Sequence, residues 1–207
     1  LGSIKTILQV QLESPEMPDA LKTETRMVLG EISRLSNKLG QLLQFSRPTV
    51  LGDSDANFTL DEVVNEVGAV MRPEAERKGI ALEVQVEDGL RAMASREAVS
   101  DIVSNLVVNG LEAASSGGRV TVSLARRDGQ ALIRVEDDGK GIPAEMREKV
   151  MQPFFTTKTQ GTGLGLAIVA RRVSEAAGKL ELESPAANGH GTRLSIWLRL
   201  RKNEATK

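Results

Sequence analysis

The sequence predicts an α+β protein, in which a helical hairpin over residues 1–46 precedes an α/β sandwich over residues 58–200. Apolar residues recur at helical spacing near the N-terminus, which indicates the hairpin. Farther along, segments of alternating polarity are interspersed with helical patterns, which indicates helices on one face of a mixed sheet. Glycine-rich motifs fall between these elements, where loops are expected.

Two apolar stripes predict the hairpin. A first short helix carries Ile4, Leu8 and Leu12, and a turn with two prolines follows it. The second helix repeats an apolar residue every seven positions, at Leu21, Val28, Leu35 and Leu42. Such helices bury little by themselves, so we expect a homodimer that forms a four-helix bundle. The alternative is that the hairpin packs on the rest of its own chain.

The hairpin is followed by a short linker. Arg47-Pro48 ends the second helix, because a residue before proline avoids the helical region. Residues 47–57 read as a linker and residues 201–207 as a polar tail. Leu1 lies in a segment that already looks helical, so we expect the chain to be a fragment that lacks its upstream part.

The sandwich is predicted element by element from periodicity and from turn residues. Ser95 is a candidate N-cap, Gly79 and Gly178 follow helix ends, and Asp128-Gly129 indicates a β-hairpin. The expected helices span 60–78, 96–114 and 164–177, and the expected strands span 80–86, 119–127, 131–137, 179–183 and 193–200.

Composition excludes several classes of function. The net charge of −1 gives no reason to expect nucleic acid as a partner. One histidine and no cysteine argue against a structural zinc site and disulfides, and fit a cytoplasmic location. No apolar run approaches the roughly 20 residues of a membrane span, so we expect no membrane contact by this fragment.

An asparagine pair is the first of the chemical motifs. Asn105 and Asn109 are four residues apart, so a helix places both amides on one face. Magnesium prefers hard oxygen ligands, and a neutral amide oxygen does not repel a triphosphate. The pair therefore predicts a Mg²⁺ site, although two polar residues on a helix surface would look the same.

Asp137, Gly139 and Gly141 form the second motif, at the end of a predicted strand. A carboxylate there can accept a hydrogen bond from the exocyclic amine of adenine, and the glycines let the base approach the backbone. Alone, the motif is more often simply a turn. Thr192, in the turn before the last strand, could reach the same base through its hydroxyl or a water.

A third motif predicts a phosphate site. Gly161, Gly163 and Gly165 alternate before a helix that opens at Leu164, where free N–H groups and the helix dipole attract anions. The spacing matches neither a dinucleotide fingerprint nor a P-loop. Residues 151–162 are expected to form a lid over the nucleotide.

The lid carries the fourth motif, Phe154–Lys158. We expect its phenylalanines to anchor the lid, Thr157 to contact the nucleotide and Lys158 to pair with a phosphate. The alternative is that Lys158 is a solvated lysine. His190 is interpreted as a turn residue without a catalytic role.

In this order, the motifs resemble those of bacterial sensor histidine kinases, whose ATP-binding domain shares its fold with gyrase, MutL and the heat-shock chaperone ATPase. Residues 105–109 resemble the asparagine box, 137–142 and 161–166 the two glycine boxes, 153–158 the phenylalanine box, and Gly191-Thr192 the final short box. The Phe-Phe-Thr-Thr-Lys form is most similar to the nitrogen-regulation branch.

The resemblance implies an ATP-dependent protein-histidine kinase, with ATP and Mg²⁺ bound by the sandwich and Asn105 and Lys158 acting in catalysis. The γ-phosphate would pass to a histidine on the hairpin and then to a response regulator. The acceptor histidine is missing from this chain, and His190 does not replace it. We therefore expect ATP binding without self-phosphorylation.

Two other functions stay open on the sequence. The chain could be a nucleotide-binding, dimeric signalling scaffold without kinase activity. It could also be a hydrolysing ATPase, but the hydrolysing relatives carry glutamate where this chain has Asn105, and asparagine is a poor general base. The full protein could be membrane-anchored, with this part in the cytoplasm.

Overall fold

Two helices, α1 (Gly2–Leu12) and α2 (Asp19–Ser46), make up the N-terminal unit of the computed structural model. Residues 2–14, 17–46, 58–158, 161–186 and 189–201 are described. The chain divides into two compact units, Leu1–Arg47 and Pro48–Lys207. The predicted linker 47–57 and residues 202–207 of the predicted tail lie outside the described residues.

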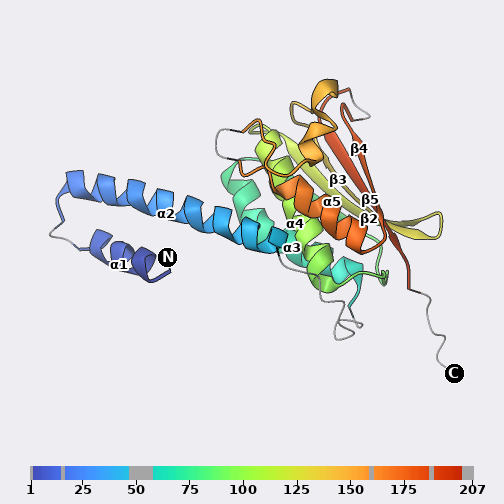
Figure 1. Cartoon of the computed structure of the whole chain (residues 1–207), viewed down its shortest axis with the longest axis horizontal. Helices are drawn as coiled ribbons and strands as arrows, with labels where there is room; N and C mark the ends of the chain where they lie inside the picture. The colour runs from blue at the N-terminus through green and yellow to red at the C-terminus, as the bar shows by residue number, and fades with distance from the viewer. Residues whose placement is uncertain (1, 15–16, 47–57, 159–160, 187–188, 202–207) are drawn as a thin grey trace. The chain divides into compact units, whose positions relative to one another are not determined.

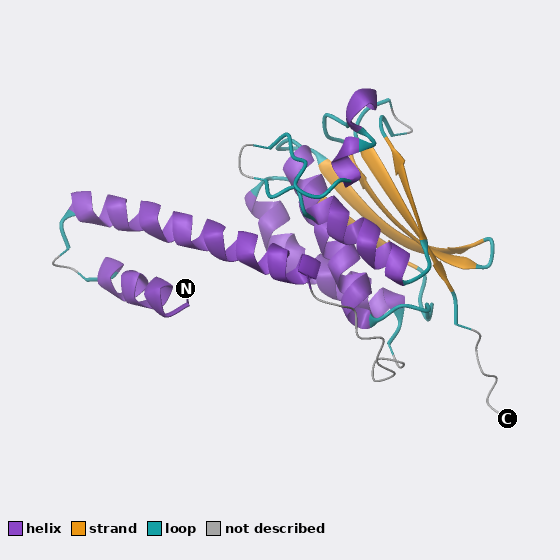
Figure 2. Cartoon of the chain, viewed as in Figure 1, coloured by secondary structure: helices purple, strands orange, loops and turns teal. Residues whose placement is uncertain are grey.

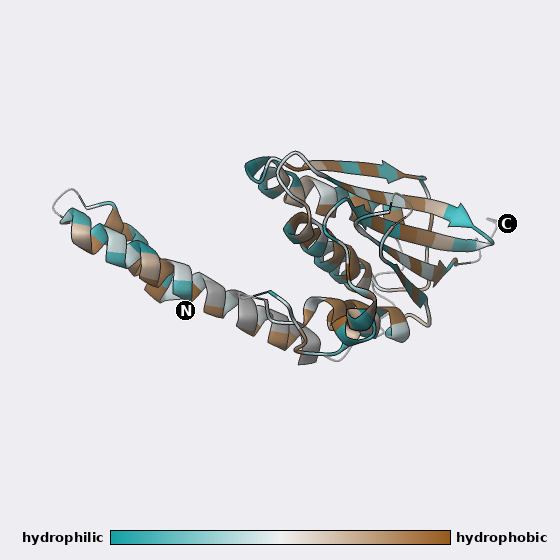
Figure 3. Cartoon of the chain, turned by 90° about the horizontal axis from the view of Figure 1, so that it is seen from above, coloured by the Kyte–Doolittle hydropathy of each residue, from teal (hydrophilic) through white to brown (hydrophobic). Residues whose placement is uncertain are grey.

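Helices α1 and α2 contact each other along the hairpin (Figures 1 and 2). Hydrophobic residues recur along both helices (Figure 3), and many of them remain exposed within a single chain. Leu21, Val28, Leu35 and Leu42 are between 45% and 53% exposed. No helix among the described residues is long and apolar enough to cross a membrane.

The second unit is a two-layer sandwich, as the sequence predicts. Its five-stranded sheet has the order β1-β2-β3-β5-β4, with β1 parallel to β2 and all other neighbours antiparallel. The three helices lie together on one face of the sheet (Figure 1). The strands are β1 (Ala81–Val86), β2 (Arg119–Arg127), β3 (Gln130–Asp137), β4 (Lys179–Glu183) and β5 (Thr192–Arg199). The helices are α3 (Leu60–Arg77), α4 (Arg96–Ala113) and α5 (Gly165–Glu175).

Local signals explain where these helices begin and end. The Ser95 hydroxyl caps α4 by accepting the Ala98 N–H at 3.1 Å, as predicted. At the start of α3 the Glu62 carboxylate accepts the Thr59 N–H at 3.0 Å, which is one half of a capping box and was not predicted from the sequence. Two short 3₁₀ turns, η2 (Ala144–Met146) and η3 (Lys149–Met151), were also not predicted.

The end of α5 differs from the prediction in one detail. The residue with positive φ is Ala177, at 47°, rather than Gly178. Position 178 requires glycine for a different reason: a Cβ there would lie 2.6 Å from the Trp197 carbonyl oxygen. The glycine thus allows close packing of the turn on β5.

The core lies between the sheet and its helices. Alternate strand residues such as Val122, Ile133 and Ile196 are at most 1% exposed on the side of the helices. Helix α4 buries Ile102 and Leu106 against them, as its apolar face predicts. The asparagines lie on an adjoining, half-buried face of α4, which meets the start of α5.

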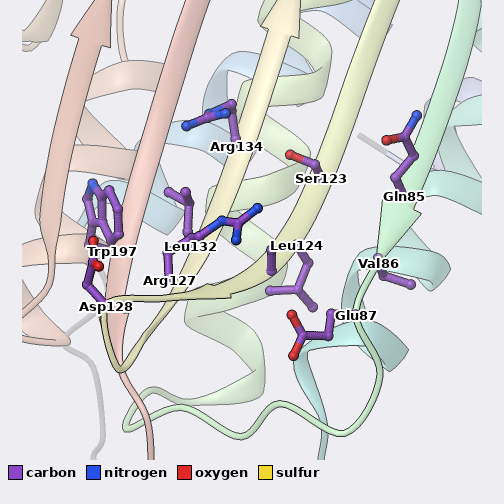
Figure 4. Close-up of a pocket in the computed structure, with 11 residues that line it drawn as sticks. Gln85, Val86, Glu87, Ser123, Leu124, Arg127, Asp128, Leu132, Arg134 and Trp197 are labelled. Carbon is purple, nitrogen blue, oxygen red and sulfur yellow. The ribbon is translucent and has the colours of Figure 1, made fainter.

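The other face of the sheet carries a hollow of about 520 Å³ (Figure 4). Leu132, Arg134 and Trp197 line it, and the Trp197 indole N–H donates to the Glu181 carboxylate at 2.9 Å. None of the predicted site residues lines this hollow. The candidate site lies on the helix-covered side.

Candidate functional site

The site is centred where β3 ends beside β5. Asp137, the last residue of β3, lies opposite Thr192, the first residue of β5, and opposite Val120 of β2. A Cβ placed on Gly110 of α4 would be 3.6 Å from the Asp137 Cβ. Antiparallel pairing and the α4 packing thus bring Asp137, Thr192 and the asparagine helix to one end of the sheet.

Asp137 is a buried acceptor, only 8% exposed. Its Oδ1 accepts the Gly139 N–H at 2.9 Å. Burial raises the pKa of this carboxyl above its ordinary value, although the N–H groups of Gly139 and Thr192 act in the opposite direction and Asp138 and Glu136 add to the rise. Thr192 thus contacts Asp137 through its backbone, whereas the sequence reading emphasised its hydroxyl.

The turn after Asp137 is packed against the end of α4. A Cβ on Gly139 would lie 2.4 Å from the Ala113 carbonyl oxygen, so no larger residue fits there. Ser184 holds the next part of the turn: its Oγ accepts the Ile142 N–H at 2.6 Å and donates to the Gly191 carbonyl at 3.0 Å. The sequence offers no local signal for this role of Ser184.

The two asparagines of α4 face the start of α5. The Asn105 Nδ2 donates to the Asp101 carbonyl at 2.8 Å, which leaves its Oδ1 to accept. A Cβ on Gly165 would lie 3.3 Å from the Asn105 Oδ1 and 3.4 Å from the Asn109 Nδ2. The structure therefore brings the predicted metal ligands and the predicted phosphate loop together.

Lys158, from the segment predicted to form a lid, reaches the same helix face. Its Nζ lies 3.3 Å from the Asn109 Oδ1 and forms an ion pair with Glu112, a residue that the sequence reading did not select. Glu112 lies three residues after Asn109, so helical spacing places both on one side of α4. Tertiary folding alone brings Lys158 to them.

The glycine loop is held by the backbone of the preceding segment. Phe154 donates its N–H to the Gly163 carbonyl at 2.9 Å. Gly163 has a φ of +67°, and a Cβ there would lie 2.4 Å from the Phe154 carbonyl carbon. Leu164 is 2% exposed and precedes the first turn of α5.

The expectation that the phenylalanines anchor the lid is wrong for Phe154. Its side chain is 64% exposed, and its backbone, at a φ of 69°, makes the contact with the loop instead. Thr157 is exposed, so its role in nucleotide binding stays a prediction. A Cβ on Gly161 would lie 2.4 Å from the Thr156 Oγ1, which places Gly161 against the same segment.

A buried ion pair joins the two helices behind the site. The Arg172 guanidinium of α5 contacts the Asp101 carboxylate of α4 at 2.9 and 3.0 Å, and the two side chains are 4% and 14% exposed. The Asp101 backbone carbonyl accepts from the Asn105 amide, so the same residue contacts Arg172 through its side chain and Asn105 through its backbone. The four-residue spacing of Asp101 and Asn105 on a predicted helix could have indicated this contact from the sequence.

A hollow of about 490 Å³ opens beside Lys158 and Glu112. Leu111 and Ala114 of the α4 end, Gly161 of the loop and Lys78 also line it. The Lys78 ammonium donates to the Leu111 carbonyl at 3.2 Å. His190 is exposed in the turn before β5 and does not line this hollow.

Comparison with known proteins shows the family of the chain. Residues 94–202 match the family described as histidine kinase-, DNA gyrase B-, and HSP90-like ATPase. Sporulation kinase C of Bacillus subtilis (strain 168) is 31% identical over 191 residues, which cover 91% of this chain and 44% of that protein. The chain thus spans less than half of that relative's length.

Solved structures of histidine kinases resemble the chain in both sequence and fold. The mycobacterial sensor histidine kinase MprB is 33% identical with a TM-score of 0.61, over 70% of this chain and 96% of that chain. Histidine kinase ThkA in complex with response regulator protein TrrA is 26% identical with a TM-score of 0.71, over 99% of this chain and 57% of that chain. The chain therefore belongs to the histidine kinase-, DNA gyrase B-, and HSP90-like ATPase family and contains the catalytic domain of a bacterial sensor histidine kinase.

Proposed function

We propose that the second unit binds magnesium-ATP and transfers its γ-phosphate to a histidine. The observation that carries this proposal is that a buried carboxylate, two amides, a lysine and a glycine loop lie along the C-terminal half of α4. A carboxylate accepts a hydrogen bond from the adenine amine, and the loop and lysine match the charge of the phosphates. The carboxylate thus suits the base of a nucleotide, and the loop and lysine suit the phosphates at its other end.

Asp137 is assigned to the adenine amine. Its other partners are N–H donors from Gly139 and Thr192, which orient the carboxylate and leave acceptor capacity for a further donor. Gly139 and Gly141 let the base approach the turn. Thr192 shapes the same end of the pocket from β5.

The residues fit a magnesium ion. The Asn105 amide has its Nδ2 engaged with the backbone of Asp101, so its oxygen is the free end for a metal. Asn109 already has a cation, the Lys158 ammonium, 3.3 Å from its Oδ1. We assign Asn109 and Asn105 as ligands; the ion would neutralise phosphate charge when bound.

Lys158 and the N-terminus of α5 are assigned to the phosphates. Gly161, Gly163, Leu164 and Gly165 present backbone to the nucleotide, and Thr157 lies next to Lys158. Phosphoryl transfer depends mainly on positioning and on charge stabilisation, which these groups provide. Asn105 is a poor general base, which favours transfer to an acceptor over hydrolysis.

The proposed acceptor is a histidine of the dimerisation hairpin that is not among these 207 residues: α1 and α2 contain no histidine, and the only histidine of the sequence, His190, lies in an exposed turn of the other unit. We propose that the hairpin forms a homodimer, supported by the exposed apolar residues of α1 and α2. A response regulator is the proposed next acceptor, as ThkA was solved with one. We also propose a cytoplasmic location for this part of the protein, supported by the proposed use of ATP.

Phosphate transfer tests the function. The 207 residues would be incubated with γ-labelled magnesium-ATP, beside the same chain preceded by an acceptor-bearing first helix. We expect acid-labile, alkali-stable label only in the longer form. Absence of label in both, with ATP binding intact, would instead indicate a nucleotide-binding scaffold. The nitrogen-regulation branch stays a prediction.

A further inference from the structure

The Glu112 carboxylate lies where a nucleotide's phosphates are proposed to bind, which is an unfavourable place for a negative charge. It comes one turn after Asn109 on α4 and lines the hollow beside the glycine loop. In the structure this charge is balanced by the Lys158 ammonium, which Glu112 shares with the Asn109 Oδ1. Lys158 thus bridges two residues of α4.

The bridge also holds the lid segment. The Lys158 N–H donates to the Thr156 Oγ1 at 3.1 Å, and the Gly161 N–H donates to the Lys158 carbonyl at 3.2 Å. The ammonium therefore fastens Lys158, and with it Thr156 and Gly161, to the surface of α4. Phosphates that recruit Lys158 must first separate it from Glu112.

We propose that Glu112 is a positioning residue that holds Lys158 on α4 in the nucleotide-free protein and competes with the triphosphate for it. This inference rests on the proposed function. Both partners are carboxylate or phosphate oxygens, so the lysine exchanges one anion for another. Asn109, the second partner of this ammonium, would no longer be available to Lys158 if it served as a magnesium ligand.

The strength of the pair suits a reversible contact. The Lys158 and Glu112 side chains are 39% and 42% exposed, so solvent screens their attraction. Exposed pairs of this kind change an equilibrium by about two- to fivefold. Such a pair holds the lid segment without preventing nucleotide from replacing it.

The test is a double-mutant cycle with Glu112→Gln and Lys158→Met, read by calorimetric titration with magnesium-AMPPNP and, separately, with adenosine. We expect Glu112→Gln to bind AMPPNP about two- to fivefold more tightly and adenosine with unchanged affinity. We expect Lys158→Met to weaken AMPPNP binding. In the Lys158→Met background, adding Glu112→Gln should give a clearly smaller gain than in the wild type, because only the direct repulsion between Glu112 and the phosphates is then relieved.

Asp88→Asn is the matched charge control. Asp88 is exposed and follows β1 at the sheet end opposite Asp137, because β1 begins beside Arg119. This variant should leave both affinities unchanged. Thermal unfolding of all variants checks that the fold is retained.

Three results would overturn the proposal: an unchanged or weaker AMPPNP affinity in Glu112→Gln, an equal gain for adenosine, or the same gain without Lys158. The last result would mean that Glu112 acts on the phosphates directly. A wild-type protein that binds neither ligand would instead refute the proposed function, so the two failures are distinguishable.

Discussion

Asp137 is a buried carboxyl group in an environment that disfavours its charge. Burial raises the pKa of its carboxyl in the folded protein, while the unfolded chain keeps the ordinary value. Between the two pKa values the folded state binds more protons, so this group's contribution to stability is fully present below the unfolded pKa and is lost as the pH rises through the folded pKa.

Asp137→Asn removes this dependence, because an amide does not ionise. We predict that the wild-type free energy of unfolding, relative to Asp137→Asn, falls as the pH rises from about 3 through the raised pKa of Asp137. Urea unfolding of both proteins at a series of pH values measures the difference. A difference that does not change with pH would contradict the burial argument.

Asn109 is predicted to act through the metal. Asn109→Ala should reduce the gain in AMPPNP affinity that magnesium provides by about tenfold, since one oxygen ligand is lost. Magnesium-free affinity should change far less. Titrations with magnesium and with EDTA make the comparison, and Val108→Ala, an exposed neighbour on α4, serves as the control. Equal losses with and without the metal would refute the ligand assignment.

At the scale of elements, the glycine loop depends on one left-handed residue. Gly163→Ala combines an unfavourable φ of +67° with a Cβ 2.4 Å from the Phe154 carbonyl carbon. We predict that this substitution displaces the loop and lowers AMPPNP affinity by about tenfold or more, because 1.4 kcal/mol of strain already corresponds to a factor of ten.

Gly129→Ala provides the matched control for the loop. Gly129 has a similar φ of +74° in the β2–β3 turn, but nothing lies within 4 Å of its added Cβ. We expect it to lower stability by about 1 kcal/mol and to leave AMPPNP affinity unchanged. If Gly163→Ala binds AMPPNP like the control, the loop does not shape the site.

The contact between α4 and α5 depends on a buried charge pair. Arg172→Met leaves the Asp101 carboxylate, 14% exposed, without its guanidinium. We predict a loss of about 3–5 kcal/mol in the free energy of unfolding. Urea unfolding measures it, and the double variant Arg172→Met with Asp101→Asn should recover part of the loss. A loss below about 1 kcal/mol would show that the pair does not hold these helices.

Helices and strands that depend on the local pattern of apolar, capping and turn residues were predictable from the sequence. The α4 helix, its buried Ile102 and its paired asparagines all follow from periodicity and a cap. Contacts between distant segments were not: Lys158 lies 46 positions from Glu112, and Ser184 is 42 positions from Ile142. Side-chain pattern says little about such pairs, because only the folded chain brings them together. Phe154 shows the same limit. Its hydrophobicity predicted a buried side chain, but the side chain is exposed and the backbone makes the contact with the glycine loop.

At the scale of the whole molecule, the two units differ in how much of their apolar surface they bury within a single chain. The sandwich buries a continuous core, whereas the hairpin leaves Val28, Leu35 and Leu42 about half exposed. A homodimer through these residues is the arrangement that the proposed function requires, and it stays a prediction. The catalytic domain is the part in which sequence, geometry and comparison coincide.

The measurement that tests this account most directly is calorimetric titration of magnesium-AMPPNP into the wild-type chain and into Asp137→Asn. We predict one nucleotide bound per chain in the wild type and no detectable binding in the variant, because an amide replaces the charged acceptor for the adenine amine. Unchanged affinity in Asp137→Asn, or no binding by the wild type, would contradict the nucleotide site.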